Sequence, residues 1–328
     1  MANYNTIRGL RVKYLSADPA NPEQGQVWYN STTGNLRVNG ILSDAFSAGG
    51  NTSVARSQAG GSAGVQTAAI IFSGAPTPIT QTEEYNGSSW TGGGAVSLAR
   101  YGGSSGGTST AAFFGGGSYP SGSPGPGATE EYDGSSWSGG GTMNVARKYF
   151  AGCGTLTAGL AGGGGYPPPT RAATEEYDGS SWTNGGNLNT GNYGVSIMAS
   201  GTQTAALCAG GNARTTNTES YNGSTWTNVG AMNQGRSFGG ASGTQTLGIA
   251  FGGDIGTGAL TNAENWNGSA WSANAATLAV GRGGLNCASV GLKASAIAMA
   301  GGNPANPAAN TATEEFGEIS GIETISVS

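Results

Sequence analysis

The 328-residue chain contains no histidine and only three cysteines. Because histidine is the commonest general base and transition-metal ligand, its absence removes the usual means of catalysis. Cys153, Cys208 and Cys287 stand at unrelated spacings, so we interpret them as buried thiols and leave a single nucleophile as the alternative. The four glycines of residues 162–165 lead into Tyr166 and three prolines, not into a lysine-bearing helix, which argues against phosphate binding. We therefore expect no enzyme, no cofactor and no metal.

Charged and large apolar residues are also scarce. Lys and Arg number 13 and Asp and Glu 18, with a pI near 4.8, so nucleic acid is not an expected partner. Leu, Ile, Val and Phe together number 46, which is in the range of disordered chains, but the net charge of only −5 argues against disorder. No apolar run approaches the ~20 residues of a membrane span, so we expect no membrane insertion.

Tryptophan, in contrast, recurs at a nearly constant spacing of 44 to 47 residues. Such a period is typical of solenoids, propellers or arrays. Each tryptophan ends the phrase Thr-Glu-Glu-Tyr-Asp/Asn-Gly-Ser-Ser-Trp or a close variant, and a sixth copy at residues 313–317 stops before its tryptophan. Asn-Gly and Asp-Gly predict hairpins with two-residue type I′ turns. The five tryptophans are Trp90, Trp137, Trp182, Trp226 and Trp271.

Further segments complete the repeat. A run of small apolar residues ending in glycine precedes each phrase, as in residues 68–74 and 111–116, and we interpret it as a buried strand. Another segment, which begins near an arginine, follows each tryptophan. Four short antiparallel strands in about 40–50 residues, repeated six times, are typical of propeller blades. The sequence therefore predicts an all-β fold, a six-bladed β-propeller over residues 41–328 preceded by a short hairpin and anchor segment at residues 1–40.

The order Gly-Gly, Glu-x-Tyr-Asp/Asn-Gly, Trp, Arg resembles the kelch repeat over roughly residues 42–328. The chain departs from that family in its short turn between the third and fourth strands and in its wealth of glycine and alanine. The resemblance implies a kelch-like propeller. The copper chemistry of some kelch-like oxidases requires histidine ligands, so it is not carried over.

The last repeat lacks its fourth strand. Residues 43–56 align with residues 88–100, and Phe46 then stands where a sixth tryptophan would. We predict that a strand at residues 42–47 completes the blade begun by residues 285–317, so that no sheet edge stays open. The alternative is that Ile322 to Val327 supplies this strand.

One acidic position and one basic position recur with the repeat. The acidic position is the first glutamate of the phrase, which is present in all six repeats. Because alternate residues of a strand face opposite sides, the residue after it lies on the other face, where we expect it to contact water. We interpret the invariant residues as structural ion pairs packed between blades, and the alternative is an acidic metal or substrate site. Asn192 stands where the sixth arginine would. The residues are Glu83, Glu130, Glu175, Glu219, Glu264 and Glu314, with Arg56, Arg100, Arg147, Arg236 and Arg282.

Residues 1–40 lack the repeat. Residues 27–30 and 35–38 flank Ser-Thr-Thr-Gly, a strand–turn–strand pattern. The segment resembles a short Pro-x-x-Gly-x-x-Trp-Tyr-Asn-x-Thr-x-Gly-x-Leu-x-Val hairpin of tailed-bacteriophage virion proteins, and the repeated phrase resembles structural proteins of marine phages. These resemblances imply a virion component that is assembled in the host bacterial cytoplasm. We expect the segment to anchor the chain to other virion proteins and copies to form a homo-oligomer through Trp28 and Tyr29; the alternative is that the hairpin only caps the propeller.

The loops between second and third strands vary most, and variation over a constant scaffold is typical of recognition surfaces. Neutral drift is the alternative. The candidate partner-binding residues are Tyr119, Tyr166, Arg171 and Arg214. We expect a phage tail fibre, spike or adhesin that displays the propeller toward a host-surface glycan or protein. The alternative is a capsid or tail decoration protein that contacts only virion proteins; a glycan-acting enzyme is disfavoured, because every glutamate phrase is repeated.

Overall fold

The computed structural model describes residues 12–325 except residues 24, 59–60, 76–78, 120–126, 166–168, 198–200, 289–292 and 303–309. In this part of the chain the regular structure is β-strand, apart from two single turns of 3-10 helix, η2 (Asn212–Arg214) and η3 (Lys293–Ser295). The chain divides into two compact units. We call Phe46–Gly317 the repeat unit, and Met1–Ala45 together with Glu318–Ser328 the terminal unit.

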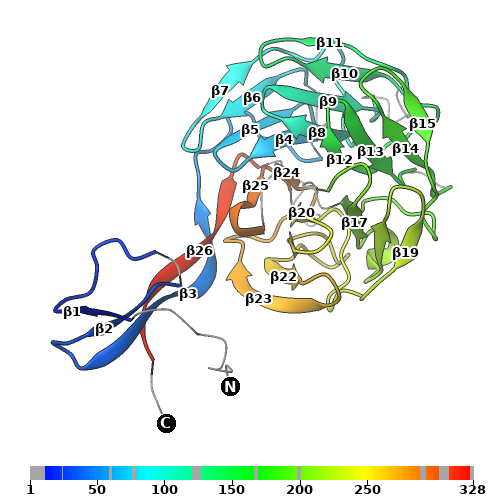
Figure 1. Cartoon of the computed structure of the whole chain (residues 1–328). Coiled ribbons are helices and arrows are strands. Elements are labelled where there is room, and N and C mark those ends of the chain that lie inside the picture. The colour runs from blue at the N-terminus through cyan, green and yellow to red at the C-terminus, as the bar shows by residue number, and fades with distance from the viewer. Residues whose placement is uncertain are drawn as a thin grey trace. The chain divides into compact units, whose positions relative to one another are not determined.

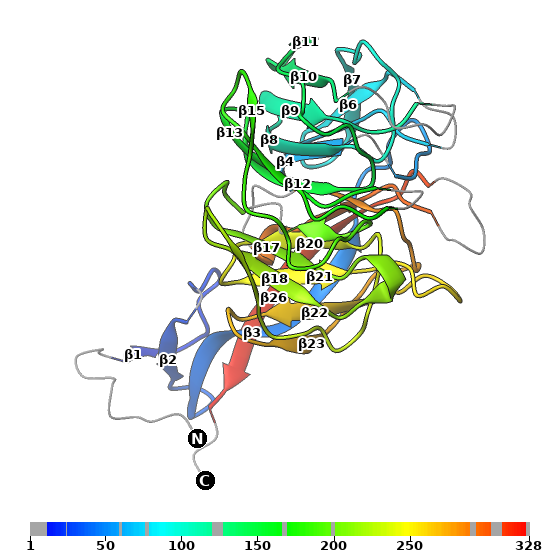
Figure 2. The same cartoon turned by 90° about the vertical axis from the view of Figure 1, so that its right-hand side faces the viewer.

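Five four-stranded antiparallel sheets succeed one another along the repeat unit (Figure 1), and Figure 2 gives the side view. The prediction of an all-β fold built from repeated four-stranded sheets is therefore confirmed. The first sheet contains β4 (Gly61–Val65), β5 (Ala68–Phe72), β6 (Thr82–Tyr85) and β7 (Trp90–Gly93); the second β8 (Ser104–Thr108), β9 (Ala111–Gly115), β10 (Thr129–Tyr132) and β11 (Trp137–Gly139); the third β12 (Ala151–Thr155), β13 (Ala158–Gly162), β14 (Thr174–Tyr177) and β15 (Trp182–Asn184); the fourth β16 (Ser196–Ile197), β17 (Ala206–Ala209), β18 (Thr218–Tyr221) and β19 (Trp226–Asn228); and the fifth β20 (Gly240–Gly243), β21 (Gly248–Phe251), β22 (Asn262–Trp266) and β23 (Trp271–Thr277).

The sixth sheet has the strand order β1-β2-β3-β26-β25-β24. Its strand β3 lies beside β26, so a strand from the beginning of the chain follows the third strand of the last repeat. Ile322 belongs to β26 itself and not to a further strand. The ring of Phe46 lies 5.2 Å from those of Phe251 and Phe316, at the place that tryptophan takes in the other sheets. The strands are β1 (Lys13–Leu15), β2 (Val27–Asn30), β3 (Asn35–Ala48), β24 (Asn286–Ala288), β25 (Ile297–Met299) and β26 (Thr313–Thr324).

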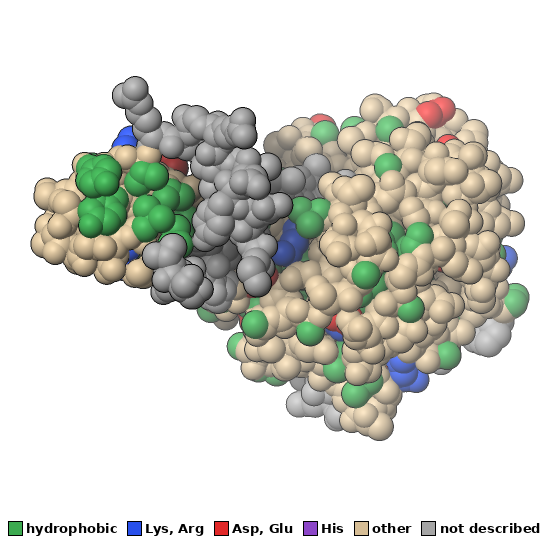
Figure 3. All heavy atoms as spheres, turned by 60° about the horizontal axis from the view of Figure 1, so that its bottom comes forward, with side chains coloured by type: hydrophobic (Ala, Val, Ile, Leu, Met, Phe, Trp, Pro, Cys, Tyr) green, Lys and Arg blue, Asp and Glu red, His purple; other side chains and the backbone are tan. Residues whose placement is uncertain are grey.

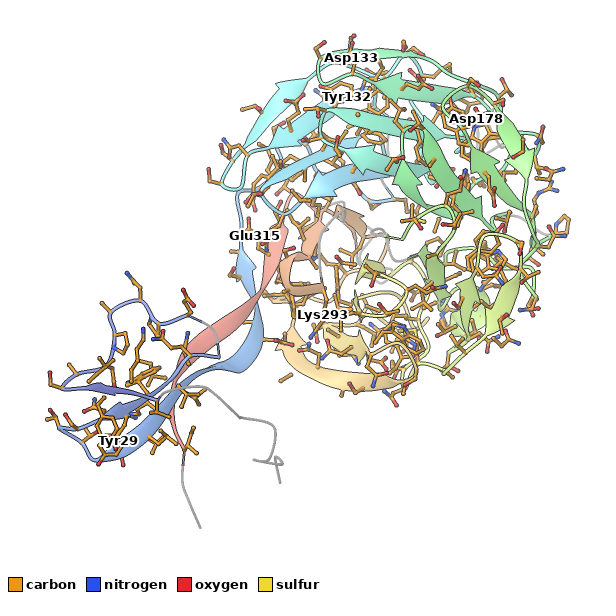
Figure 4. All side chains as sticks on the ribbon, viewed as in Figure 1. Tyr29, Tyr132, Asp133, Asp178, Lys293 and Glu315 are labelled. Atoms are coloured by element: carbon orange, nitrogen blue, oxygen red, sulfur yellow. The ribbon has the colours of Figure 1, made fainter. Side chains whose placement is uncertain are left out.

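The hairpins between third and fourth strands differ from the prediction. Tyr85 pairs with Trp90, so four residues form the loop, and the prediction of two-residue type I′ turns was wrong. Only the glycine, Gly87 at φ 90°, has positive φ. The Asn86 side chain explains the geometry, because its Oδ1 accepts the N–H groups of Ser88 and Ser89 at 3.0 and 2.9 Å. Asp133, Asp178, Asn222 and Asn267 do the same in the other sheets; Asp133 and Asp178 are labelled in Figure 4.

The core consists of thin layers between neighbouring sheets. One layer joins Ile70 and Phe72 of β5 to Ala112 and Phe114 of β9, with Trp137 packed against it. First strands of adjacent sheets also lie side by side, as β8 and β12 do. A Cβ on Gly106 would lie 3.0 Å from the carbonyl oxygen of Cys153, so glycine permits this approach. A chain with few large apolar residues is therefore stabilised by neighbouring repeats, not by one large core.

Candidate functional site

A buried ion pair links each of five sheets to the loop that precedes its first strand. Arg100 Nη2 donates to Glu130 Oε1 at 2.9 Å, and its Nη1 donates to the carbonyls of Gly116 and Ala128 at 2.6 and 2.7 Å. The second carboxylate oxygen of Glu130 accepts the N–H of Ser97 at 2.6 Å. The equivalent pairs are Arg56 with Glu83, Arg147 with Glu175, Arg236 with Glu264, and Arg282 with Glu314.

The arginine loops also reach the sheet before them. The carbonyl of Arg100 accepts the N–H of Gly74 at 3.0 Å, and that of Arg147 accepts the N–H of Gly117 at 3.0 Å. Each arginine thus holds its own sheet through the side chain and the previous sheet through the backbone. Burial lowers the pKa of Arg147 to about 10, which leaves it a cation at neutral pH. The Nη1 and Nη2 groups of Arg100 and Arg147 donate to protein atoms, while the buried Nε of each has no partner among the described residues, so these pairs hold together neighbouring parts of the fold.

We expected the second glutamate of the phrase to contact water, but the structure gives it a protein partner. It is half-buried and accepts a tyrosine hydroxyl from the next sheet: Tyr221 donates to Glu176 at 2.6 Å, and Tyr132 donates to Glu84. Trp266 stands at the tyrosine position of the fifth repeat, and the glutamate of the fourth repeat is then replaced by Ser220. Phe316 stands at the tyrosine position of the sixth repeat, and the glutamate of the fifth repeat is then replaced by Asn265. This correlated change between repeats is a signal that sequence reasoning missed.

The repeated tryptophans make a second contact of the same kind. Trp182 Nε1 donates to Thr129 Oγ1 at 2.8 Å, and Trp226 Nε1 donates to Thr174 Oγ1 at 2.9 Å. The donor and the acceptor come from neighbouring sheets. The threonine that begins the phrase Thr-Glu-Glu-Tyr…Trp and the tryptophan that ends it therefore form hydrogen bonds between neighbouring sheets. Both residues recur in the repeats because each is needed for this contact.

The hydroxyls of the repeated tyrosines should make the free energy of unfolding decrease at alkaline pH. Burial and the hydrogen bonds to glutamate raise the pKa of Tyr132, Tyr177 and Tyr221 to about 12. Because unfolded tyrosine titrates near pH ~10, the folded state holds these protons more tightly, so their contribution is complete below about pH 10 and is lost as the pH rises through about 12. We expect the free energy of unfolding of Tyr221→Phe, measured by urea melts, to fall less steeply over this window than that of wild type. Exposed Tyr14→Phe should follow wild type, and parallel curves for all three proteins would contradict the assignment.

Backbone hydrogen bonds link the residues that lie two positions after each of the five arginines and after Asn192. Each of these residues donates its N–H to the carbonyl of the previous member, at 2.6 to 3.2 Å, and Gln58 donates to Gly284 at 3.0 Å. All six residues have positive φ, which is strained for the three that are not glycine. Tyr149 packs on Phe238 at 5.3 Å, and its hydroxyl lies 3.2 Å from Gln58 Oε1. The members are Gln58, Gly102, Tyr149, Gly194, Phe238 and Gly284.

The structure describes three of the four candidate partner-binding residues. Arg171 is exposed and Tyr119 half-buried. Arg214 is 44% exposed but donates to Asp254 at 2.9 Å. In the described part of the chain no hydrogen bond, ion pair or ring contact joins these three side chains to one another. Tyr166 lies outside the described residues.

The anchor residues differ in accessibility. Trp28 is buried inside the terminal unit, and its Nε1 donates to Asp18 Oδ1 at 2.9 Å. Hydrogen bonds from Asn30 and Trp28 lower the pKa of Asp18. Tyr29 (labelled in Figure 4) is half-buried and packs at 4.9 Å against Tyr14, which is 77% exposed. Trp28 therefore stabilises the unit internally, while Tyr14 is the exposed aromatic residue; Figure 3 shows hydrophobic side chains grouped on this unit at the left.

The cysteines are poor nucleophiles where they are described. Cys153 and Cys208 are buried free thiols, and burial raises the pKa of Cys153 to about 12. Cys287 lies in β24, and its side chain is outside the described set. Over the described residues, no cluster of three or more acidic or cysteine side chains is placed to hold a metal ion. The same residues contain no helix long and apolar enough to cross a membrane.

Comparison with known proteins adds no family. No family model matches the chain, and no curated protein matches its sequence. The expectation of a kelch-like phage virion protein therefore depends only on the repeated phrase and the N-terminal hairpin of the sequence.

Proposed function

We propose that the chain is a structural protein of a tailed-bacteriophage particle, in which the terminal unit anchors the protein and the repeat unit is displayed for attachment to the host surface. The main support for the proposal is that the two units differ in structure. The terminal unit contains both ends of the chain and the segment that resembles a virion hairpin. The repeat unit is a uniform scaffold in which five buried arginine–glutamate pairs are used internally, and its variable loops are the part that we propose for recognition.

The repeat unit of this proposal is a closed, kelch-like six-bladed propeller. Four contacts between the first and last sheets support closure, and each matches a contact between sheets adjacent in the chain. Gly301 N–H donates to the Arg56 carbonyl and Gln58 N–H to the Gly284 carbonyl, both at 3.0 Å. Trp90 Nε1 donates to Thr313 Oγ1 at 3.0 Å. Tyr85 donates to Glu315 Oε1 at 2.5 Å.

The anchor of this proposal uses the exposed side chains of the terminal unit. Tyr14 is on β1, which lies at the edge of its sheet and pairs in parallel with β2. An edge strand with an exposed aromatic side chain is suited to assembly with another virion protein or another copy. We therefore add Tyr14 to Tyr29 as a residue proposed to contact the partner.

Removing the loop side chains tests attachment. We expect the combined variant Tyr119→Ala, Tyr166→Ala, Arg171→Ala and Arg214→Ala to lose at least about 10-fold in affinity for host cells, since aromatic and guanidinium groups carry much of the energy of interfaces. The measurement is binding of labelled protein to the host. Ser138→Ala combined with Thr227→Ala, on exposed positions of fourth strands, is the matched control. Equal binding of both variants would exclude these loops.

Electron microscopy of particles carrying a labelled chain tests the location. Label at a tail tip or fibre supports attachment. Label distributed over the capsid or tail tube supports the second candidate, a decoration protein that contacts only virion proteins, which the internal use of charge also favours. Particles without label would contradict both.

A further inference from the structure

Five copies of the repeat show what the glutamate of the third strand binds. In the fifth sheet, Arg236 Nη2 donates to Glu264 Oε1 at 2.8 Å, while Nη1 donates to the carbonyls of Gly252 and Asn262 at 2.8 and 3.2 Å. The other carboxylate oxygen accepts the N–H of Asn233 at 2.7 Å. One carboxylate oxygen and two carbonyls thus form a repeated receptor for a guanidinium group.

The fourth sheet has this receptor without the arginine. Asn192 occupies the arginine position, since its carbonyl accepts the N–H of Gly164 at 2.7 Å, as the arginine carbonyls do in other repeats. Its shorter side chain does not reach the glutamate. Instead, Nδ2 donates to the Gly210 carbonyl at 2.8 Å, and Oδ1 accepts the N–H of Asn212 at 2.7 Å.

Glu219 therefore has one satisfied and one unsatisfied oxygen. Oε2 accepts the N–H and the Nδ2–H of Asn189, both at 2.8 Å. Over the described residues, Oε1 receives no hydrogen bond and Glu219 has no ion pair. The side chain belongs to a residue that is only 6% exposed. A largely buried carboxylate without a cation is costly, so a cation placed at this oxygen would stabilise the fold.

We propose that Glu219 binds a small monovalent cation of the guanidinium class, in the position that an arginine side chain takes in the other five sheets. Its ligands are Glu219 Oε1 and the carbonyl of Asn217, which corresponds to Asn262 in the fifth sheet. Within the described part of the chain, that carbonyl accepts only the N–H of Gly210, at 3.0 Å. Asn192 is half-buried, whereas the arginines are buried, so this position is reachable from solvent.

The chemistry of the receptor selects the ligand. A single carboxylate and a carbonyl match a hydrogen-bond donor with one positive charge, and planar guanidinium presents its N–H groups in the fork that arginine uses. A divalent ion would need further oxygen ligands, and no cluster of acidic side chains that could supply them occurs in the described regions. An anion would be repelled by the carboxylate.

Thermal melting of the full chain in guanidinium chloride, compared with sodium chloride at equal concentration, tests the site. At concentrations of about 1–20 mM the denaturing action of guanidinium is negligible. We expect the melting temperature of wild type to rise by about 2 °C and then to saturate. Glu219→Gln removes the charge and should abolish the rise. Asn192→Arg supplies the cation covalently and should abolish it as well.

Arg236→Asn provides a second, independent measurement. This variant copies the fourth sheet into the fifth, so it should melt lower than wild type and regain part of the loss in guanidinium, with a larger rise than wild type shows. Equal responses of wild type and Glu219→Gln would overturn the proposal, whatever happens to the other variants. A rise in wild type that Asn192→Arg retains would place the cation elsewhere and would also overturn it.

Discussion

Replacing Arg147 by methionine is expected to lower the free energy of unfolding by about 3–5 kcal/mol, because it leaves the Glu175 carboxylate buried without its cation. Arg147 and Glu175 are both fully buried, and their side chains meet at 3.1 Å. The guanidinium also donates to the Gly163 carbonyl at 3.0 Å, so the substitution removes a donor from the backbone as well. Urea melts at neutral pH measure the loss.

Two further variants separate this effect from a general loss of charge. Arg214→Met breaks an ion pair whose arginine is 44% exposed, and it should cost less than about 1 kcal/mol. Arg147→Met combined with Glu175→Leu removes both buried charges and should recover much of the stability, since buried ion pairs can often be replaced by apolar residues. A single variant that costs no more than Arg214→Met would contradict the structural role of the pair.

Deleting residues 1–48 is expected to prevent the remaining chain from folding to a stable monomer. The deletion removes β3, so β26 becomes an open edge that can pair with other chains. It also removes Phe46, which packs against Phe251 and Phe316. Phe46 is half-buried, so its loss alone costs less than the ~3–5 kcal/mol of a fully buried phenylalanine, but even part of that is large beside the ~5–15 kcal/mol of a typical domain. Size-exclusion chromatography and circular dichroism measure the outcome.

A chain that begins at Val12 keeps every strand that the structure describes and serves as the control. Phe46→Ala is the milder variant and should lower the melting temperature without the aggregation expected of the open edge. A peptide of residues 35–48 added to the deleted chain should restore the monomer, because the strand is then supplied in trans. A deleted chain that stays monomeric and melts like wild type would show that β3 does not complete the last sheet.

Sequence periodicity predicted the parts of the fold that repeat without change. The phrase around Tyr85 and Trp90 indicated a hairpin, and the missing tryptophan of the last repeat directed attention to Phe46. The recurrence of an arginine and a glutamate in the repeat, such as Arg100 and Glu130, indicated an ion pair, and the structure places these two side chains 2.9 Å apart. These inferences succeeded because sixfold repetition separates constant structural requirements from local variation.

Other features could not be predicted, because they depend on which sheet lies beside which. Glu84 was expected in water since alternation places it on the opposite face from Glu83, but that face meets the next sheet, where Tyr132 donates to it. The four-residue hairpin loop depends on the hydrogen bonds that the Asn86 side chain accepts as well as on the positive φ of Gly87. Trp28 was expected to be an anchor, yet it is buried and donates a hydrogen bond to Asp18, which lies in an irregular segment between β1 and β2.

The alternation of Gln58, Tyr149 and Phe238 with three glycines limits how regular such a chain can be. A Cβ on Gly102 would lie 2.7 Å from the ring of Tyr149, and one on Gly194 would lie 2.9 Å from the ring of Phe238. Six identical modules would therefore place either six crowded side chains or none at these positions. A protein designed from one averaged module could not reproduce this alternation, and a design that keeps it would need a module of double length, used three times.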